Sequence, residues 1–161
     1  RKLDGRLARA IVSIPAVKAM EIGAGFDAAR KSGAEVHDEI EPAPGGGHAR
    51  KGNVRRRTNR AGGLEGGITT GEPLVLRAAM KPISTLMSPL ATIDATTGAR
   101  AEAAAERSDV TAVPAMGVIA EAMTALVLAD AFAEKFGGDS LVEMRRNFDG
   151  YISHIAARFG S

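Results

Sequence analysis

Residues 106–138 read ERSDVTAVPAMGVIAEAMTALVLADAFAEKFGG, a short polar segment that runs into the longest apolar stretch of the chain. Pro114 suits the first turn of a helix, because its missing N–H would have no partner there, and the glycine pair at 137–138 marks the helix end. The residues between them leave little room for a polar stripe, so we expect a long helix that is buried on most of its circumference. That helix would hold Arg107 and Asp109 in place, and their spacing alone indicates a surface ion pair.

The composition is typical of a folded protein with a core of small and aliphatic side chains. The chain has 161 residues, of which 45% are apolar, 25% charged and 4% aromatic, and its net charge is +2. These values favour closely packed helices and sheets, and we expect one α+β domain over residues 1–161. The absence of cysteine excludes disulfides and thiolate chemistry. We find neither a secretory signal nor the roughly 18 unbroken apolar residues of a membrane span, so we expect a cytoplasmic protein.

Hydrophobic periodicity predicts the main elements of the first half. Apolar residues at helical spacing predict an amphipathic helix from Leu3 to Ile14, ended by Pro15. Alternation then predicts a strand at Val17–Ile22. Further predicted elements are strands at Leu74–Met80 and Pro89–Asp94, an extended arm at Ala99–Arg107 and a helix from Asp139 to Phe159 with an Asp or Ser cap.

The segment Val36–Ile40, VHDEI, has the composition of another short strand. A histidine followed by two carboxylates suggests metal binding. Adjacent residues of a strand point to opposite faces, however, so these side chains do not converge. We therefore expect a structural role for this segment and no metal site.

Residues 41–60, EPAPGGGHARKGNVRRRTNR, are rich in Pro, Gly and basic residues and predict a flexible loop. Their summed positive potential would attract an anionic substrate. The alternative is that most of these arginines are solvated or pair with acidic residues elsewhere in an oligomer. The basic cluster consists of Arg50, Lys51, Arg55, Arg56, Arg57 and Arg60.

Two segments follow that favour close contact with an anionic ligand. Residues 61–73, AGGLEGGITTGEP, are dense in glycine, which is typical of tight turns or of close backbone approach. They contain neither a GxGxxG spacing nor a Walker lysine. The segment Lys81–Thr85, KPIST, places a cation, a rigid proline and two hydroxyls at a strand end, a combination that suits an anion.

The segment 107–123, RSDVTAVPAMGVIAEAM, resembles the C-terminal signature of the chorismate synthase family, including its Glu121-Ala122-Met123 ending. The segments SIPAVKAMEIGAGFDAAR, VHDEI and NRAGGLEGGITTGEPLVLRAAMKPISTL occur in the order and approximate spacing of that family, so the resemblance covers nearly the whole chain. The family's N-terminal half, with its two active-site histidines, has no counterpart, and we expect a C-terminal part of the enzyme. A departure is Ala19, where a glycine is common. None of His37, His48 and His154 matches the family's histidines.

The resemblance implies a lyase that converts 5-enolpyruvylshikimate 3-phosphate into chorismate by anti 1,4-elimination of phosphate, a step of the shikimate pathway. Its cofactor would be reduced FMN, with NADPH as a candidate reductant. It also implies a homotetramer and a β-α-β sandwich in which antiparallel sheets enclose helices. The chain alone would contribute much of the flavin site without carrying out the elimination.

The resemblance also assigns roles to individual residues. Asp109 would be catalytic and would help to move a proton through the N5 position of the flavin. Arg107, a planar donor for an oxyanion, would bind either the flavin or the departing phosphate. The flavin-contacting positions would be Pro15, Ala16, Gly66, Lys81, Pro82, Ile83, Ser84, Thr85 and Arg107.

Two other interpretations compete with the enzyme. One is a non-enzymatic module that holds RNA or a phosphorylated partner with the basic loop. The lack of aromatic residues for stacking on bases argues against this interpretation. The other is an incomplete chain whose surfaces cover a missing domain. That interpretation predicts exposed apolar patches and self-association.

Overall fold

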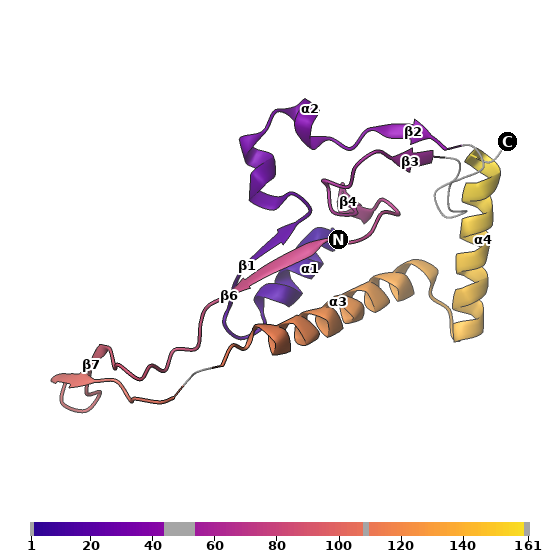
Figure 1. Cartoon of the computed structure of the whole chain (residues 1–161). Helices are drawn as coiled ribbons and strands as arrows, with labels where there is room; N and C mark the ends of the chain where they lie inside the picture. Colours follow the sequence, from indigo (N-terminus) through magenta and orange to yellow (C-terminus); the bar gives the residue numbers. More distant parts are fainter. Residues whose placement is uncertain (1, 44–53, 108–109, 160–161) are drawn as a thin grey trace.

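The computed structural model describes residues 2–43, 54–107 and 110–159, and within these ranges the chain is a mixed α+β structure (Figure 1). The described strands form four two-stranded antiparallel sheets, β1 with β6, β2 with β3, β4 with β5 and β7 with β8. The predicted α+β class is therefore confirmed. The two longest helices, α3 (Val113–Phe136) and α4 (Leu141–Phe159), follow the sheets in sequence.

The packed centre of the molecule is α1 (Leu3–Val12) against the sheet of β1 (Val17–Ile22) and β6 (Leu76–Met80). Leu7 and Ile11 of α1 are 0% and 2% exposed, as their helical spacing predicts. Two adjoining clusters form around them, and both reach one face of α3. The predictions of the first helix, of β1 and of β6 are thus confirmed.

The prediction that α3 is buried on most of its circumference is wrong. Met116 is its only buried residue, although one side of the helix packs on α1 and on the central sheet. On another side, Val118, Ile119 and Leu126 are 68%, 48% and 66% exposed. In Figure 1, α1 and β6 lie above α3 and no described part of the chain lies below it, so a second apolar face stays uncovered.

Helix α3 is also long and apolar enough to cross a membrane, by length and composition alone. Core helices of globular proteins pass the same test. One face of α3 nevertheless packs on α1 and the central sheet.

The strand predicted at Val36–Ile40 is shifted in the structure. Val36 ends the short helix α2 (Gly33–Val36), and strand β2 is Ile40–Pro42. A capping box explains the difference, since Glu35 accepts hydrogen bonds from the backbone N–H and the hydroxyl of Ser32 at 3.1 and 2.7 Å and so begins a helical turn. Among the described residues, no group of three ligand-type side chains is placed to hold a metal ion.

Part of the 41–60 segment is strand rather than loop, since residues 41–42 belong to β2 and residues 54–56 to a further strand, whereas residues 57–60 are not in a strand. Strand β3 (Val54–Arg56) pairs with β2, and Glu41 lies opposite Arg55. Residues 44–53, which include His48, Arg50 and Lys51, lie outside the described residues. The arginines of β3 and the residue after it pair with acidic residues of the same chain. The ion pairs are Arg55 with Glu41 at 3.0 Å, Arg56 with Glu65 at 2.7 Å and Arg57 with Glu39 at 2.9 Å.

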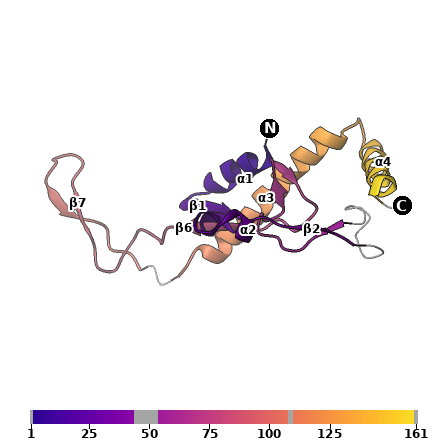
Figure 2. The same ribbon diagram turned by 90° about the horizontal axis from the view of Figure 1, so that it is seen from above.

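An arm of residues 86–106 extends away from the packed centre (Figures 1 and 2). Its tip is the hairpin of β7 (Ala91–Ile93) and β8 (Arg100–Glu102), and Leu86 bridges Ala105 near its base. Met87, Leu90 and Ile93 are 68%, 65% and 66% exposed. Together with α3, the arm displays the exposed apolar patches that an incomplete chain predicts.

Helix α4 begins as predicted with a serine cap, because Ser140 Oγ accepts a hydrogen bond from Glu143 N at 3.2 Å. Phe148 and Tyr151 of α4 contact Phe136 of α3 with ring centroids 5.3 and 5.5 Å apart. These aromatic contacts join the two helices. The remaining elements are the 3-10 helix η1 (Gly25–Arg30) and the short strands β4 (Leu64–Glu65) and β5 (Ile68–Thr69).

Candidate functional site

The first part of the site is the junction between α1 and β1, which lies beside the end of β6. Ala16 has a φ of +66°, a left-handed conformation that L residues other than Asn and Asp rarely adopt. Its carbonyl accepts a hydrogen bond from Lys81 N at 2.9 Å. The structure therefore brings Pro15 and Ala16 together with the start of the KPIST segment, as the prediction requires.

The KPIST segment leads from β6 into the arm. Lys81, Pro82, Ile83 and Ser84 are exposed, and Thr85 is half-buried. The bridge between Leu86 and Ala105 brings the outgoing and returning chains together at the base of the arm. Arg107, which is exposed, follows this bridge by two residues. Asp109, the predicted catalytic residue, lies outside the described residues.

Gly66 occupies a different place, in the turn between β4 and β5. Its φ is +61°, and a Cβ at this position would meet no atom within 4 Å, so the turn needs glycine and faces open space. The neighbouring Gly67 accepts a hydrogen bond from Leu3 N at 2.8 Å, which fixes the turn at the N-terminal end of α1. Ala16 follows the other end of α1. Because a ten-residue helix is about 15 Å long, one chain does not bring Gly66 together with Ala16 and Lys81.

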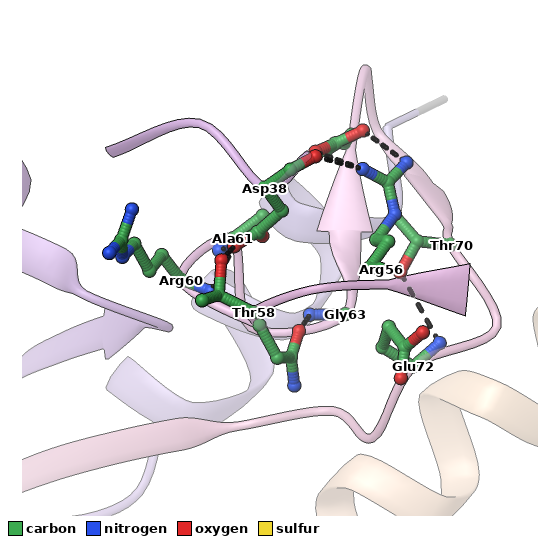
Figure 3. A network of polar contacts seen from close by, with 10 residues as sticks. Asp38, Arg56, Thr58, Arg60, Ala61, Gly63, Thr70 and Glu72 are labelled. Carbon is green, nitrogen blue, oxygen red and sulfur yellow. Dashed lines mark hydrogen bonds and ion pairs between the residues drawn. The ribbon is translucent and has the colours of Figure 1, made fainter. Parts of the chain in front are cut away.

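A buried carboxylate, that of Asp38, lies among Thr58, Arg60 and Ala61 in the segment that precedes β4 (Figure 3). Asp38 is 6% exposed and accepts hydrogen bonds from Thr58 Oγ1, from Arg60 N at 2.8 Å and from Ala61 N at 2.9 Å. Desolvation raises the pKa of Asp38, but the hydrogen bonds from Thr58, Ala61 and Arg60 and the charge of Arg56 together outweigh it and hold that pKa below its usual value. The expected structural role of the VHDEI segment is confirmed, with Asp38 as its anchor.

Close backbone packing explains part of the glycine-rich segment. A Cβ on Gly62 would lie 2.3 Å from Gly23 N, and a Cβ on Gly23 would lie 2.1 Å from Arg60 O, so neither position admits a side chain. Val75 bonds to both glycines, through its carbonyl to Gly23 N at 2.9 Å and through its amide to Gly62 O at 3.1 Å. Both predicted uses of glycine occur, close approach at Gly62 and an open turn at Gly66.

A cavity of about 980 Å³ lies elsewhere, between the β2–β3 hairpin, the β4–β5 region, α3 and α4. None of the predicted site residues lines it. Its cations are already engaged, since Arg56 pairs with Glu65 and Lys135 Nζ lies 3.7 Å from the centre of the Tyr151 ring. We therefore place the candidate site at the junction of α1, β1 and β6 and not in this cavity.

The residues at that junction fit a flavin nucleotide. Lys81 supplies a cation, and Ser84 and Thr85 supply hydroxyls that suit a phosphate. Ala16, half-buried and left-handed in its backbone, lies beside them. The open turn at Gly66 lies at the other end of α1 and is not part of this junction within one chain. These are properties of the described residues themselves.

Fold and site together define an α+β protein that carries a lysine and two hydroxyl side chains at the end of a two-stranded antiparallel sheet. The family model of chorismate synthase matches residues 1–133, and the chain therefore belongs to the chorismate synthase family. Among its relatives, the chorismate synthases of Parafrankia sp. (strain EAN1pec) and Salinispora tropica are each 60% identical over 158 residues. The alignments cover 98% of this chain and 39% and 38% of those relatives.

A solved structure agrees with the sequence relatives. A crystal structure of a chorismate synthase superposes with a TM-score of 0.75 at 42% identity, covering 98% of this chain and 38% of the other. The chain thus spans about two-fifths of the length of the curated relatives it matches.

Proposed function

We propose that this chain is the flavin-contacting part of a chorismate synthase, which eliminates phosphate from 5-enolpyruvylshikimate 3-phosphate to give chorismate. The observation that carries the proposal is the hydrogen bond between Lys81 N and Ala16 O. It joins two segments that are 65 residues apart and that both resemble flavin-contacting motifs of the family. Reduced FMN, when bound, would lend electron density to the reaction and take it back.

The chain's own residues would divide the work at this site. Lys81, Ser84 and Thr85 would hold an anionic group, while Pro15 and Ala16 would lie against the flavin. Pro82 and Ile83, between these polar residues, would shape the contact surface. Arg107 would bind a phosphate oxygen of the cofactor or of the substrate.

Asp109 would be the catalytic residue. A carboxylate beside the flavin suits the transfer of the proton lost from the substrate ring through the N5 position. The aspartate follows Arg107 by two residues, so the returning chain of the arm would bring both groups to one site.

We further propose the family's β-α-β sandwich. The uncovered face of α3, with Val118, Ile119 and Leu126, supports it, because a second sheet on that face would bury side chains that the described chain leaves exposed. Residues 1–161 would then be one portion of a single domain. The predicted flexible loop at 41–60 stays a prediction, because residues 44–53 lie outside the described residues.

A homotetramer in the cytoplasm completes the proposal. Gly66 and Ala16 lie at opposite ends of α1, so a second copy of the chain is well suited to bring its own Gly66 turn toward the first copy's Lys81. The partners would be 5-enolpyruvylshikimate 3-phosphate and reduced FMN, with NADPH as candidate reductant. We propose no nucleic-acid or membrane partner. The pairing of Arg55, Arg56 and Arg57 within the chain argues against the RNA-binding alternative.

Reconstitution tests the proposal. The 161-residue chain is co-expressed with the segment that precedes the aligned region in the Parafrankia relative, and chorismate formation is assayed with reduced FMN. We expect activity from the combination and none from either part alone. A well-folded combination that binds FMN but forms no chorismate would contradict the proposed reaction.

A further inference from the structure

We infer that Arg56, acting through Glu65, and Asp38, acting through residues 58–61, are positioning residues for the Gly66 turn and that they set the affinity for the flavin. This inference rests on the proposed function, because it assumes that the flavin contacts Gly66. The geometry comes from the described residues alone (Figure 3).

Arg56 links β3 to the residue directly before Gly66. Its Nη1 and Nη2 donate to Glu65 Oε1 and Oε2 at 3.0 and 2.7 Å, a two-point contact that fixes orientation as well as distance. Nη1 also donates to the backbone carbonyl of Asp38 at 3.3 Å. The Arg56 side chain is only 16% exposed, so its position is set by the surrounding chain.

Asp38 fixes the other side of the same hairpin. Its carboxylate holds Thr58, Arg60 and Ala61, and between them Asn59 Oδ1 accepts a hydrogen bond from Gly63 N at 2.8 Å. Gly63 directly precedes β4. Asp38 therefore supports the start of the β4–β5 hairpin indirectly, through the segment that contains Asn59. Arg56 supports it directly, beside its turn, through Glu65.

The hairpin needs this external support because it is very short. Strands β4 and β5 have two residues each, and an isolated two-stranded hairpin is marginally stable even when longer. Leu64 is buried and Gly67 bonds to Leu3, so the hairpin stays attached to α1 without Arg56. A Cβ placed on Gly66 would have no other atom within 4 Å. What the Arg56–Glu65 contact adds is the direction in which the turn points.

A positioning role and a merely structural role of the Arg56–Glu65 contact predict different effects of losing it. Losing the Arg56–Glu65 contact should loosen the turn while leaving the core around Leu64 intact. Flavin affinity should then fall without a matching fall in the melting temperature of the flavin-free protein. Glu65 is 43% exposed in its side chain, which makes Glu65→Gln a mild substitution for folding.

The experiment uses the chain assembled with its preceding segment and titrates FMN by quenching of flavin fluorescence, with melting temperatures measured without flavin. Glu39→Gln is the control, because it also removes a carboxylate from an arginine pair, with Arg57 at 2.9 Å, but from a more exposed pair whose two residues lie outside the β4–β5 hairpin. We expect Glu65→Gln to weaken FMN binding about fivefold to tenfold. We expect Glu39→Gln to leave it unchanged, and both flavin-free melting temperatures to stay close to that of the unsubstituted protein.

Asp38→Asn provides the second variant. The side-chain amide nitrogen of the new asparagine would face a backbone N–H that now donates to a carboxylate oxygen. This variant should therefore weaken FMN binding at least as much as Glu65→Gln and also lower the melting temperature. If that variant fails to fold, Glu65→Gln decides alone. Equal FMN affinity for Glu65→Gln and Glu39→Gln would overturn the inference, as would a flavin-free melting temperature of Glu65→Gln that falls in step with its FMN affinity. An unsubstituted assembly that does not bind FMN at all would instead refute the proposed function.

Discussion

The region around α1 and the region formed by the arm and the outer face of α3 differ in how far the chain covers its own apolar side chains. Leu7 and Ile11 are at most 2% exposed, whereas Leu90, Ile93 and Leu126 are about two-thirds exposed. All five are large aliphatic residues, so composition does not explain the difference. The first region buries its own apolar side chains, whereas the second leaves them exposed, and the proposed sandwich would cover them.

The largest expected effect is in the self-contained region. Leu7→Ala removes a fully buried side chain and should reduce the free energy of unfolding by about 3 kcal/mol. Urea denaturation should show this loss of unfolding free energy in the 161-residue chain alone. It should show the same loss in the assembly, that is, the chain combined with the segment that precedes the aligned region in the Parafrankia relative. A loss below about 1 kcal/mol in the chain alone would mean that α1 is not its core.

The next effect separates the two regions. Leu126→Ala should change the stability of the 161-residue chain by less than about 0.5 kcal/mol, because Leu126 is 66% exposed there. In the assembly, where a second sheet would cover α3, the same substitution should cost about 2 kcal/mol. Equal small effects in both would contradict the proposed sandwich.

Protonation of Asp38 provides a pH test of the hydrogen bonds by which this residue holds residues 58–61 before the glycine-rich turns. Its pKa is held below the ordinary value by the hydrogen bonds that outweigh desolvation, so its contribution to stability is present above the unfolded pKa of about 3.9. That contribution is lost as the pH falls through the lower folded pKa. Asp38→Asn should reduce the free energy of unfolding by about 2 kcal/mol at neutral pH. Because the variant lacks this carboxylate, its free energy of unfolding should fall less steeply as the pH is lowered, as measured by urea titrations at several pH values.

The smallest effect concerns the ion pairs between α1 and α3. Arg6 bonds to Asp130 and, at 2.9 Å, to Glu134, but both carboxylates are mostly exposed. Arg6→Gln should therefore cost only about 0.5 kcal/mol, and less in high salt. The exposed Arg145, 3.8 Å from Asp149, is the matched control, and Arg145→Gln should be nearly neutral.

The sequence predicts what local patterns determine. Periodicity located α1, β1 and β6, and Pro114 with the glycine pair at 137–138 located the ends of α3. The burial of α3 was not predictable from its own residues, because burial depends on what covers the helix. The shift of β2 follows from the Ser32–Glu35 capping box, a local signal that the composition of VHDEI concealed.

The site was partly predictable for the same reason. Ala16 precedes β1 and Lys81 follows β6, and these two strands pair. Their hydrogen bond joins the two segments to which the resemblance assigns flavin contacts. The anchoring role of Asp38 was missed, since its donors lie 20 to 23 residues further along the chain. The separation of Gly66 from Ala16 likewise depends on the length of α1 between them.

The central claim is that the junction of Ala16 with the KPIST segment holds a flavin, and a titration of the assembly with FMN tests it most directly. Lys81→Met removes the cation at the junction, and Lys31→Met removes an exposed cation after η1 as a control. We predict that Lys81→Met weakens FMN binding about tenfold or more while Lys31→Met leaves it unchanged. Identical FMN affinity for the two variants would contradict the account.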